Sequence, residues 1–124
     1  MSERMQVLIV DDQPRARQSL RTLLATWPRV KGVREAANGR QAVRLVEESL
    51  PDMVLMDVRM PEMDGLEATR IIKARWPRVT VILLSMYSSY EADALIAGAD
   101  AFVSKGESPD RLLDTLAAVT NKEA

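Results

Sequence analysis

Short apolar runs alternate along this chain with longer segments in which apolar residues recur at helical spacing. Three runs are almost continuously apolar: 5–10 (MQVLIV), 53–56 (MVLM) and 79–84 (VTVILL). Runs of this length and character are typical of strands that are buried on both faces of a parallel sheet. Two weaker runs, 33–36 (VREA) and 101–103 (AFV), predict edge strands, because the first alternates with charged residues and the second is very short.

Segments with helical periodicity fill the intervals between these runs. In the first, apolar residues recur from Ala16 to Trp27, and Pro28 marks the predicted end because the residue before a proline is pushed out of helical geometry. Four polar residues of this segment are predicted to lie on the opposite, outward face: Arg15, Arg17, Gln18 and Arg21.

Capping signals delimit the other four helices. Three of them begin with a side chain that can cap the amino end, followed three residues later by Glu or Gln that can reach back. These pairs are Asn38 with Gln41, Asp64 with Glu67, and Ser88 with Glu91. The third and fourth helices are expected to stop at Trp76-Pro77 and at Gly98, and Ser108-Pro109 opens the fifth.

Five units of strand followed by helix account for the whole chain of 124 residues, a length that suits one domain. Such alternation predicts an α/β fold, in which a parallel sheet is covered by helices on both faces through right-handed crossovers. The fully apolar first, third and fourth strands belong in the centre, and the second and fifth belong at the edges. We therefore predict a doubly wound, five-stranded parallel sheet of flavodoxin-like type, with strand order 2-1-3-4-5 and five flanking helices.

Polar residues follow the predicted strands at their carboxyl ends, where open parallel sheets bind ligands. They are Asp11 and Asp12 after the first strand, Asp57 after the third, Ser85 after the fourth, and Ser104 and Lys105 after the fifth. Most have a plainer interpretation: an aspartate before Pro14 can cap the first helix, Ser85 can belong to a turn, and Lys105 can be a surface lysine. Asp57 has no such interpretation, because Met60-Pro61 separates it from the next helix.

The predicted cluster of carboxylates indicates a cation site. Two carboxylates about 5 Å apart repel each other by roughly 3 kcal/mol at an effective dielectric constant of 20. Three of them should therefore take up a proton or bind a cation. Oxygen ligands without histidine or cysteine favour a hard ion, and protein-bound Mg²⁺ commonly accepts phosphate oxygens. A lysine and a hydroxyl beside the cation would suit the other oxygens of a phosphoryl group.

Composition excludes several other classes of site. The chain has no cysteine and no histidine, which removes disulfides, zinc fingers and Ser-His catalysis. The formal net charge is −1 and the arginines are scattered among acids, so direct binding of nucleic acid is not expected. The polar start MSERMQ and the short apolar runs indicate neither a signal peptide nor a membrane span, and we expect a cytoplasmic protein.

Four motifs give the chain a resemblance to the receiver domain of two-component response regulators. They are VLIVDDQP, LMDVRMPEMDG, VILLS and AFVSK, which occur in this order at the ends of the predicted strands. Each motif alone is a weak signal, whereas the set is highly specific. The resemblance covers essentially all of the chain, so we expect residues 1–124 to form a single receiver domain with no output domain in this chain.

The resemblance implies a role for each acidic residue of the predicted site. Asp57 would be the phosphoacceptor, which attacks the phosphorus of a phosphohistidine on a sensor histidine kinase. Asp12 and Asp57 would bind Mg²⁺ directly, with the backbone carbonyl of Arg59 as a third ligand. Asp11 would act mainly through a metal-bound water.

The same resemblance implies how the signal would spread. Lys105 and Ser85 would each contact a phosphoryl oxygen. Phe102 lies at the switch-aromatic position of the family, and it would rotate inward when Ser85 moves, which would reshape the face made by the fourth helix and fifth strand. A plain core aromatic is the alternative interpretation of Phe102.

Two features depart from the family pattern or vary within it. The family commonly has proline in a cis peptide after the lysine, where this chain has Gly106. A cis bond to a non-proline residue costs roughly 2.5–4 kcal/mol, and a non-proline here is similar to receivers attached to helix-turn-helix DNA-binding domains. Arg59 and Tyr87, two residues beyond Asp57 and Ser85, are large, and we predict that they crowd the path of hydrolytic water and prolong the phosphorylated state.

The predicted function is a signalling switch that is phosphorylated by a histidine kinase and is not an enzyme beyond its own phosphorylation and slow dephosphorylation. Its target would be a downstream protein or a covalently linked DNA-binding domain, and a homodimer could form through the first and fifth helices or the fourth-helix face. Three alternatives stay open at this point: a degenerate receiver that only binds proteins, an aspartate-based phosphohydrolase and a flavodoxin-like cofactor carrier. The phosphohydrolase would commonly have an acidic residue two positions after the nucleophile, where this chain has Arg59. The cofactor carrier would need glycines or hydroxyl side chains to bind a phosphate in the loop after the first strand, which here reads DDQPRAR.

Overall fold

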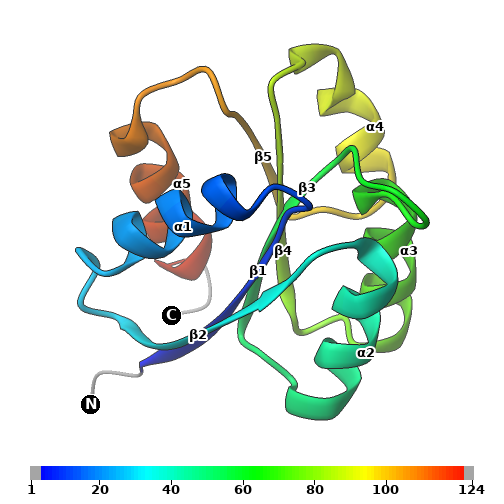
Figure 1. Ribbon diagram of the computed structural model, residues 1–124, viewed down its shortest axis with the longest axis horizontal. Coiled ribbons are helices and arrows are strands. Elements are labelled where there is room, and N and C mark those ends of the chain that lie inside the picture. The colour runs from blue at the N-terminus through cyan, green and yellow to red at the C-terminus, as the bar shows by residue number, and fades with distance from the viewer. Residues whose placement is uncertain (1–3, 122–124) are drawn as a thin grey trace.

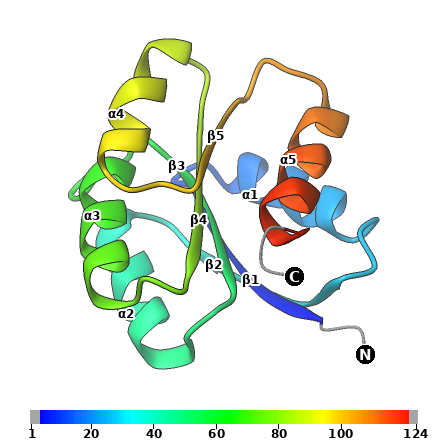
Figure 2. The same ribbon diagram turned by 180° about the vertical axis from the view of Figure 1, so that it is seen from behind.

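A computed structural model describes residues 4–121 as a five-stranded parallel sheet between two layers of helices (Figure 1). The strands are β1 (Met5–Val10), β2 (Val30–Ala36), β3 (Met53–Asp57), β4 (Thr80–Ser85) and β5 (Ala101–Ser104), and the helices are α1 (Pro14–Leu24), α2 (Gly39–Ser49), α3 (Gly65–Arg75), α4 (Glu91–Ile96) and α5 (Pro109–Asn121). The strand order is β2-β1-β3-β4-β5, so the predicted topology is confirmed. Helices α1 and α5 cover one face of the sheet, and α2, α3 and α4 cover the other, as the reverse view also shows (Figure 2).

The central strands are buried on both faces, which explains their continuous apolar sequence. Alternate residues of β1 point to opposite sides: Leu8 and Val10 join the core beneath α2, α3 and α4, whereas Val7 and Ile9 join the core beneath α1 and α5. Every residue of β3 except Asp57 is completely buried. Burial on both sides fixes the register of these strands, and it therefore fixes which residues reach the carboxyl edge.

Two of the three predicted helix caps are confirmed. Asn38 accepts a hydrogen bond from the backbone N–H of Gln41, and Asp64 accepts one from the N–H of Glu67. The prediction for Ser88 is wrong, because residues Ser88–Tyr90 form a 3-10 turn in which the N–H of Tyr90 bonds to the Tyr87 carbonyl. Ser88 therefore lies inside helical backbone, and α4 begins only at Glu91.

Several predicted boundaries are shifted. Helix α1 ends at Leu24 rather than at Pro28, because a turn closes first: the N–H of Trp27 bonds to the Leu24 carbonyl. Strand β2 begins at Val30, three residues earlier than the alternating pattern predicted, and it pairs with β1 from Val30 to Ala36, with one shift in register between Met5 and Gln6. No helix within residues 4–121 combines the length and the apolar character that crossing a membrane would need.

Candidate functional site

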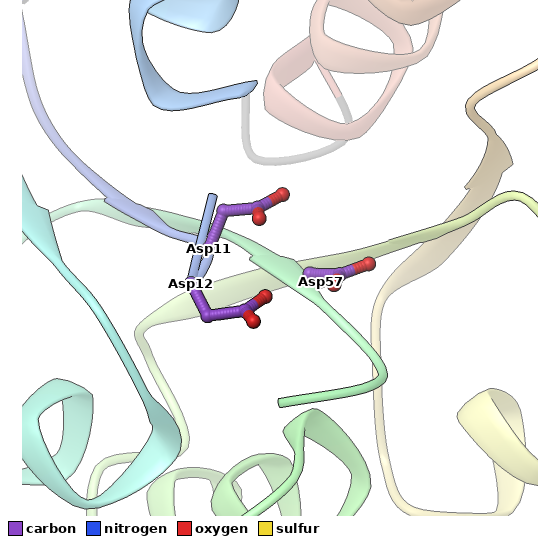
Figure 3. Close-up of side chains that lie close together, drawn as sticks. All are labelled: Asp11, Asp12 and Asp57. Atoms are coloured by element: carbon purple, nitrogen blue, oxygen red, sulfur yellow. The ribbon is translucent and has the colours of Figure 1, made fainter. Parts of the chain in front are cut away.

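The carboxyl ends of β1 and β3 bring three aspartates together. Asp11 and Asp12 follow β1 directly, and Asp57 is the last residue of β3, so the parallel register places all three at one edge of the sheet. Figure 3 shows their carboxyl groups gathered where the two strands end. One carboxylate oxygen of each lies within 4.8 Å of the others. The structure therefore brings together the predicted acidic cluster.

Asp11 is the most deeply buried of the three, with 1% of its surface exposed. Its Oδ1 accepts a hydrogen bond from the backbone N–H of Gln13 at 2.9 Å, and its Oδ2 accepts one from Lys105 Nζ at 2.7 Å. Gln13, in extended backbone, occupies the N-cap position of α1, whose N-cap makes no side-chain hydrogen bond. The plainer interpretation of Asp11 or Asp12 as a helix cap is therefore wrong.

Lys105 connects β5 to the acidic cluster. Its ammonium group lies 3.2 Å from Asp57 Oδ1 as well as 2.7 Å from Asp11 Oδ2, and its backbone N–H bonds to the Ser85 carbonyl at 2.8 Å. Burial acts to lower the pKa of Lys105, but the hydrogen bond that Lys105 donates to Asp11 and the charge of Asp57 outweigh it and raise the pKa. The lysine is therefore a fixed cation of the site and not a free surface residue.

The surroundings of Asp57 disfavour the ionised form of its carboxyl group. Burial raises the pKa of its carboxyl above the ordinary value of 3.8, and the charges of Asp11 and Asp12 act in the same direction, against the attraction of Lys105. A cation bound among the three carboxylates would counteract this effect, because it would add the positive charge that one lysine does not supply.

Gly65 allows the amino end of α3 to approach Asp57 closely. A Cβ atom at position 65 would collide with the backbone carbonyl oxygen of Asp57. The N–H of Gly65 bonds to the carbonyl of Val58 at 2.7 Å, and the N–H of Val58 bonds to the Leu84 carbonyl at 3.0 Å. The backbone after Asp57 is thus held from two sides, which fixes the position of the main chain from which the Asp57 side chain extends.

Ser85 and Phe102 occupy the places that the sequence predicted. The buried Ser85 ends β4, and its hydroxyl accepts a hydrogen bond from the N–H of Tyr87 at 3.0 Å. Phe102 lies on β5 opposite Leu83 and packs, half-buried, against the core on the α4 side. The peptide between Lys105 and Gly106 is trans.

An aromatic and cationic cluster stands beside the acidic one. The guanidinium of Arg59 lies 5.8 Å from the centre of the Tyr87 ring, a distance at which a cation–π attraction operates. Tyr87 in turn meets Tyr90 edge to face, with ring centres 6.4 Å apart. Tyr90 lines the cleft that contains Asp12 and Asp57, a position that the helical pattern around it did not reveal.

Arg17 is a second residue that the sequence reasoning missed. It was predicted to face outward, but its Nη1 donates a hydrogen bond to the backbone carbonyl of Asp11 at 2.7 Å and its Nε donates one to Glu35 at 2.8 Å. The one sequence signal was a charge pairing: Glu35 is a lone acid in β2, and Arg17 and Arg21 are one helical turn apart on the neighbouring helix.

A doubly wound sheet with an acidic cluster, a lysine and a hydroxyl at its carboxyl edge is typical of receiver-type signalling domains. The chain belongs to the response regulator receiver domains, whose family model matches residues 7–117. It is accordingly a component of two-component signal transduction, in which receiver domains act in phosphorylation-dependent signalling.

Individual relatives agree with this assignment. An uncharacterized transcriptional regulatory protein of Bacillus subtilis (strain 168), YhcZ, is 42% identical over 113 residues, which are 90% of this chain and 53% of that protein. The transcriptional regulatory protein DegU of Brevibacillus brevis is 36% identical over 118 residues, covering 94% of this chain and 50% of DegU. A crystal structure of a LuxR-family two-component response regulator from Aurantimonas sp. SI85-9A1 superposes with a TM-score of 0.88 at 33% identity, covering 94% of this chain and 85% of that one. The chain thus spans about half the length of the two curated relatives.

Proposed function

We propose that Asp57 accepts a phosphoryl group from a phosphohistidine of a sensor histidine kinase, with Mg²⁺ bound at the acidic cluster. The observation that carries this proposal is a group of three carboxylates with oxygens within 4.8 Å of one another, two of which, those of Asp11 and Asp57, pair with the ammonium group of Lys105. An arrangement of this kind suits a reaction centre that receives a cation and a phosphoryl group together.

The residues present fit a magnesium ion. All the side-chain donors of the cluster are carboxylate oxygens, the ligand type that hard divalent cations prefer. Burial raises the pKa of Asp57, and the charges of Asp11 and Asp12 add to that effect, so a nearby cation would favour its ionised form. Asp12, Asp57 and the backbone carbonyl of Arg59 would hold the ion directly, and Asp11 would hold it through water. When bound, Mg²⁺ neutralises negative charge on the phosphoryl oxygens.

The protein's own groups perform the transfer. A carboxylate oxygen of Asp57 attacks the phosphorus, a P–O bond forms, and the P–N bond to the kinase histidine breaks. The histidine leaves as neutral imidazole after it takes up a proton from the solvent. Lys105, already held at the site, donates to one phosphoryl oxygen, and the Ser85 hydroxyl donates to another after it moves toward the phosphoryl group.

Phosphorylation would then change the partner-binding face. Ser85 would leave its bond with the N–H of Tyr87 to reach the phosphoryl group, and Phe102 would fill the space behind it. The change would spread to the surface of α4 and β5, where Leu95 and Ile96 of α4 are exposed apolar side chains, as is Met86 directly after β4. Because the relatives YhcZ and DegU are named transcriptional regulatory proteins, the output we propose for the whole protein is regulation of transcription in the cytoplasm.

The proposal is tested by phosphorylation in solution. The protein is incubated with acetyl phosphate and Mg²⁺, and its intact mass is measured. We expect the parent to gain one phosphoryl group and the variant Asp57→Asn to gain none.

A further inference from the structure

Arg17 joins three parts of the fold beside the acidic cluster. From α1, its Nη1 donates to the backbone carbonyl of Asp11 at 2.7 Å, and its Nε donates to Glu35 Oε1 on β2 at 2.8 Å. Its side chain is 20% exposed, so the guanidinium is largely enclosed by these partners. One side chain thus connects the first helix and the edge strand to the residue at which the acidic cluster begins.

Glu35 holds this guanidinium in one orientation. Its second oxygen, Oε2, accepts a hydrogen bond from Arg21 Nε at 2.8 Å, so each carboxylate oxygen is bonded to a different arginine. The hydrogen bonds from Arg21 and Arg17 lower the pKa of Glu35, which keeps it ionised at neutral pH. The planar fork of Arg17 therefore has one end fixed on β2 and the other on Asp11.

The hydrogen bond from Arg17 to the Asp11 carbonyl affects the orientation of Asp12. This carbonyl belongs to the peptide that links Asp11 to Asp12, and the preceding peptide is already held because the N–H of Asp11 bonds to the Ala36 carbonyl at 3.1 Å. Rotation of the Asp11–Asp12 peptide would swing the Asp12 carboxylate relative to Asp57. Arg17 is the side chain that opposes this rotation.

We propose that Arg17 is a positioning residue for the cation site, which it serves by fixing the peptide that orients Asp12. This inference rests on the proposed function, because it assumes that Asp12 and Asp57 share a divalent cation. Outer-shell groups that orient metal ligands typically change metal affinity by 10–100-fold when they are removed. Arg17 touches no predicted ligand atom, so its effect must pass through the backbone.

Electrostatics makes the test decisive. Removing a positive charge near three carboxylates would by itself strengthen cation binding, whereas loss of positioning would weaken it. The experiment titrates Mn²⁺ into the parent, Arg17→Met and Arg21→Met, and follows free Mn²⁺ by electron paramagnetic resonance. Arg21→Met is the matched control, because Arg21 shares Glu35 but has no bond to Asp11. Urea unfolding of all three proteins reports the stability lost with each arginine.

We expect Arg17→Met to bind Mn²⁺ about 10-fold more weakly than the parent, and Arg21→Met to bind within twofold of it. Equal affinities for the two variants would overturn the positioning role and leave the proposed function standing. Failure of the parent to bind Mn²⁺ would overturn both.

Arg17→Lys covers the case in which the Met variant does not fold. It keeps the charge but cannot span Glu35 and the Asp11 carbonyl with one planar fork, and we expect an affinity between those of the parent and the Met variant. An affinity equal to that of the parent would show that the planar fork of Arg17 is not needed and would overturn the proposal.

Discussion

Lys105 and Asp11 form an ion pair of 2.7 Å in which the carboxylate is 1% exposed and the lysine side chain is 23% exposed. The same ammonium group lies 3.2 Å from Asp57, so it connects the ends of β1, β3 and β5. Among the residues that the structure describes, this ammonium group pairs with two of the three clustered carboxylates, which leaves the cluster with more negative than positive charge. This imbalance is the physical reason for a cation at the site, and it leads to the first two predictions.

Replacing Lys105 should destabilise the fold. In Lys105→Met, Asp11 would stay buried without its charged partner, and removing one member of a largely buried pair costs up to about 3–5 kcal/mol. Because the lysine is partly exposed, we expect a loss of about 2 kcal/mol in the free energy of unfolding at pH 7, measured with urea. Lys31→Met, at an exposed position of β2, is the control and should change stability by less than about 0.5 kcal/mol. Equal stabilities of the two variants would contradict the prediction.

Asp57→Asn should make the protein more stable at neutral pH. Burial raises the pKa of Asp57 above its ordinary value of 3.8, so its contribution to stability is fully present below that value and is lost as the pH rises through the raised pKa. Asparagine does not ionise and avoids this loss. Without divalent ions, the urea midpoint of the variant should exceed that of the parent at pH 7, and the gap should narrow toward pH 4. A parent that is the more stable protein at pH 7 would show that Lys105 outweighs the burial penalty.

Helix α3 should not tolerate a side chain at its first residue. Gly65→Ala would place a methyl group against the carbonyl oxygen of Asp57, and the backbone would have to move. We expect a loss of about 1–3 kcal/mol in the free energy of unfolding, because overpacking against the backbone has few ways to relax. Gly106→Ala is the control, since the added Cβ would meet only Ser104 Oγ, at 3.7 Å, and should be nearly neutral. Similar stabilities would mean that the approach of α3 to Asp57 is not tight.

The cation–π pair of Arg59 and Tyr87 should slow hydrolysis of the phosphorylated state. The guanidinium of Arg59 lies 5.8 Å from the centre of the Tyr87 ring. Arg59 also lines the cleft that contains Asp57, from which an attacking water would approach. Replacing both with alanine should speed dephosphorylation several-fold, followed by the decay of the phosphorylated mass after removal of the donor. Arg70→Ala, at an exposed position of α3, serves as the control. A decay rate for the double variant equal to that of the parent would rule out shielding by this pair.

Residues governed by topology could be predicted from the sequence. Once the three apolar runs are assigned to central parallel strands, Asp11, Asp57 and Ser85 must lie at one edge, because strand direction and register leave no alternative. Asn38 and Asp64 were also predictable, since a helix cap depends only on residues within one turn.

Features that depend on distant partners could not be predicted. Helical periodicity placed Arg17 on the outward face, but it does not show that Glu35 on β2 lies within reach of that face. The extra residues of β2 likewise depend on pairing with β1. Two other misses have a local cause, because short turns compete with the predicted signals: the turn from Leu24 to Trp27 ends α1 before Pro28, and the turn from Tyr87 to Tyr90 replaces the cap at Ser88.

The central claim is that Asp57 is the phosphoacceptor and that it works with a divalent cation. The most direct test is intact-mass measurement after incubation with acetyl phosphate, with Mg²⁺ and with excess chelator, for the parent, Asp57→Asn and the exposed control Asp93→Asn. The account predicts one added phosphoryl group on the parent and on Asp93→Asn with Mg²⁺ only, and none on Asp57→Asn. A parent that gains no phosphoryl group, or an Asp57→Asn variant that is modified as readily as the parent, would contradict it.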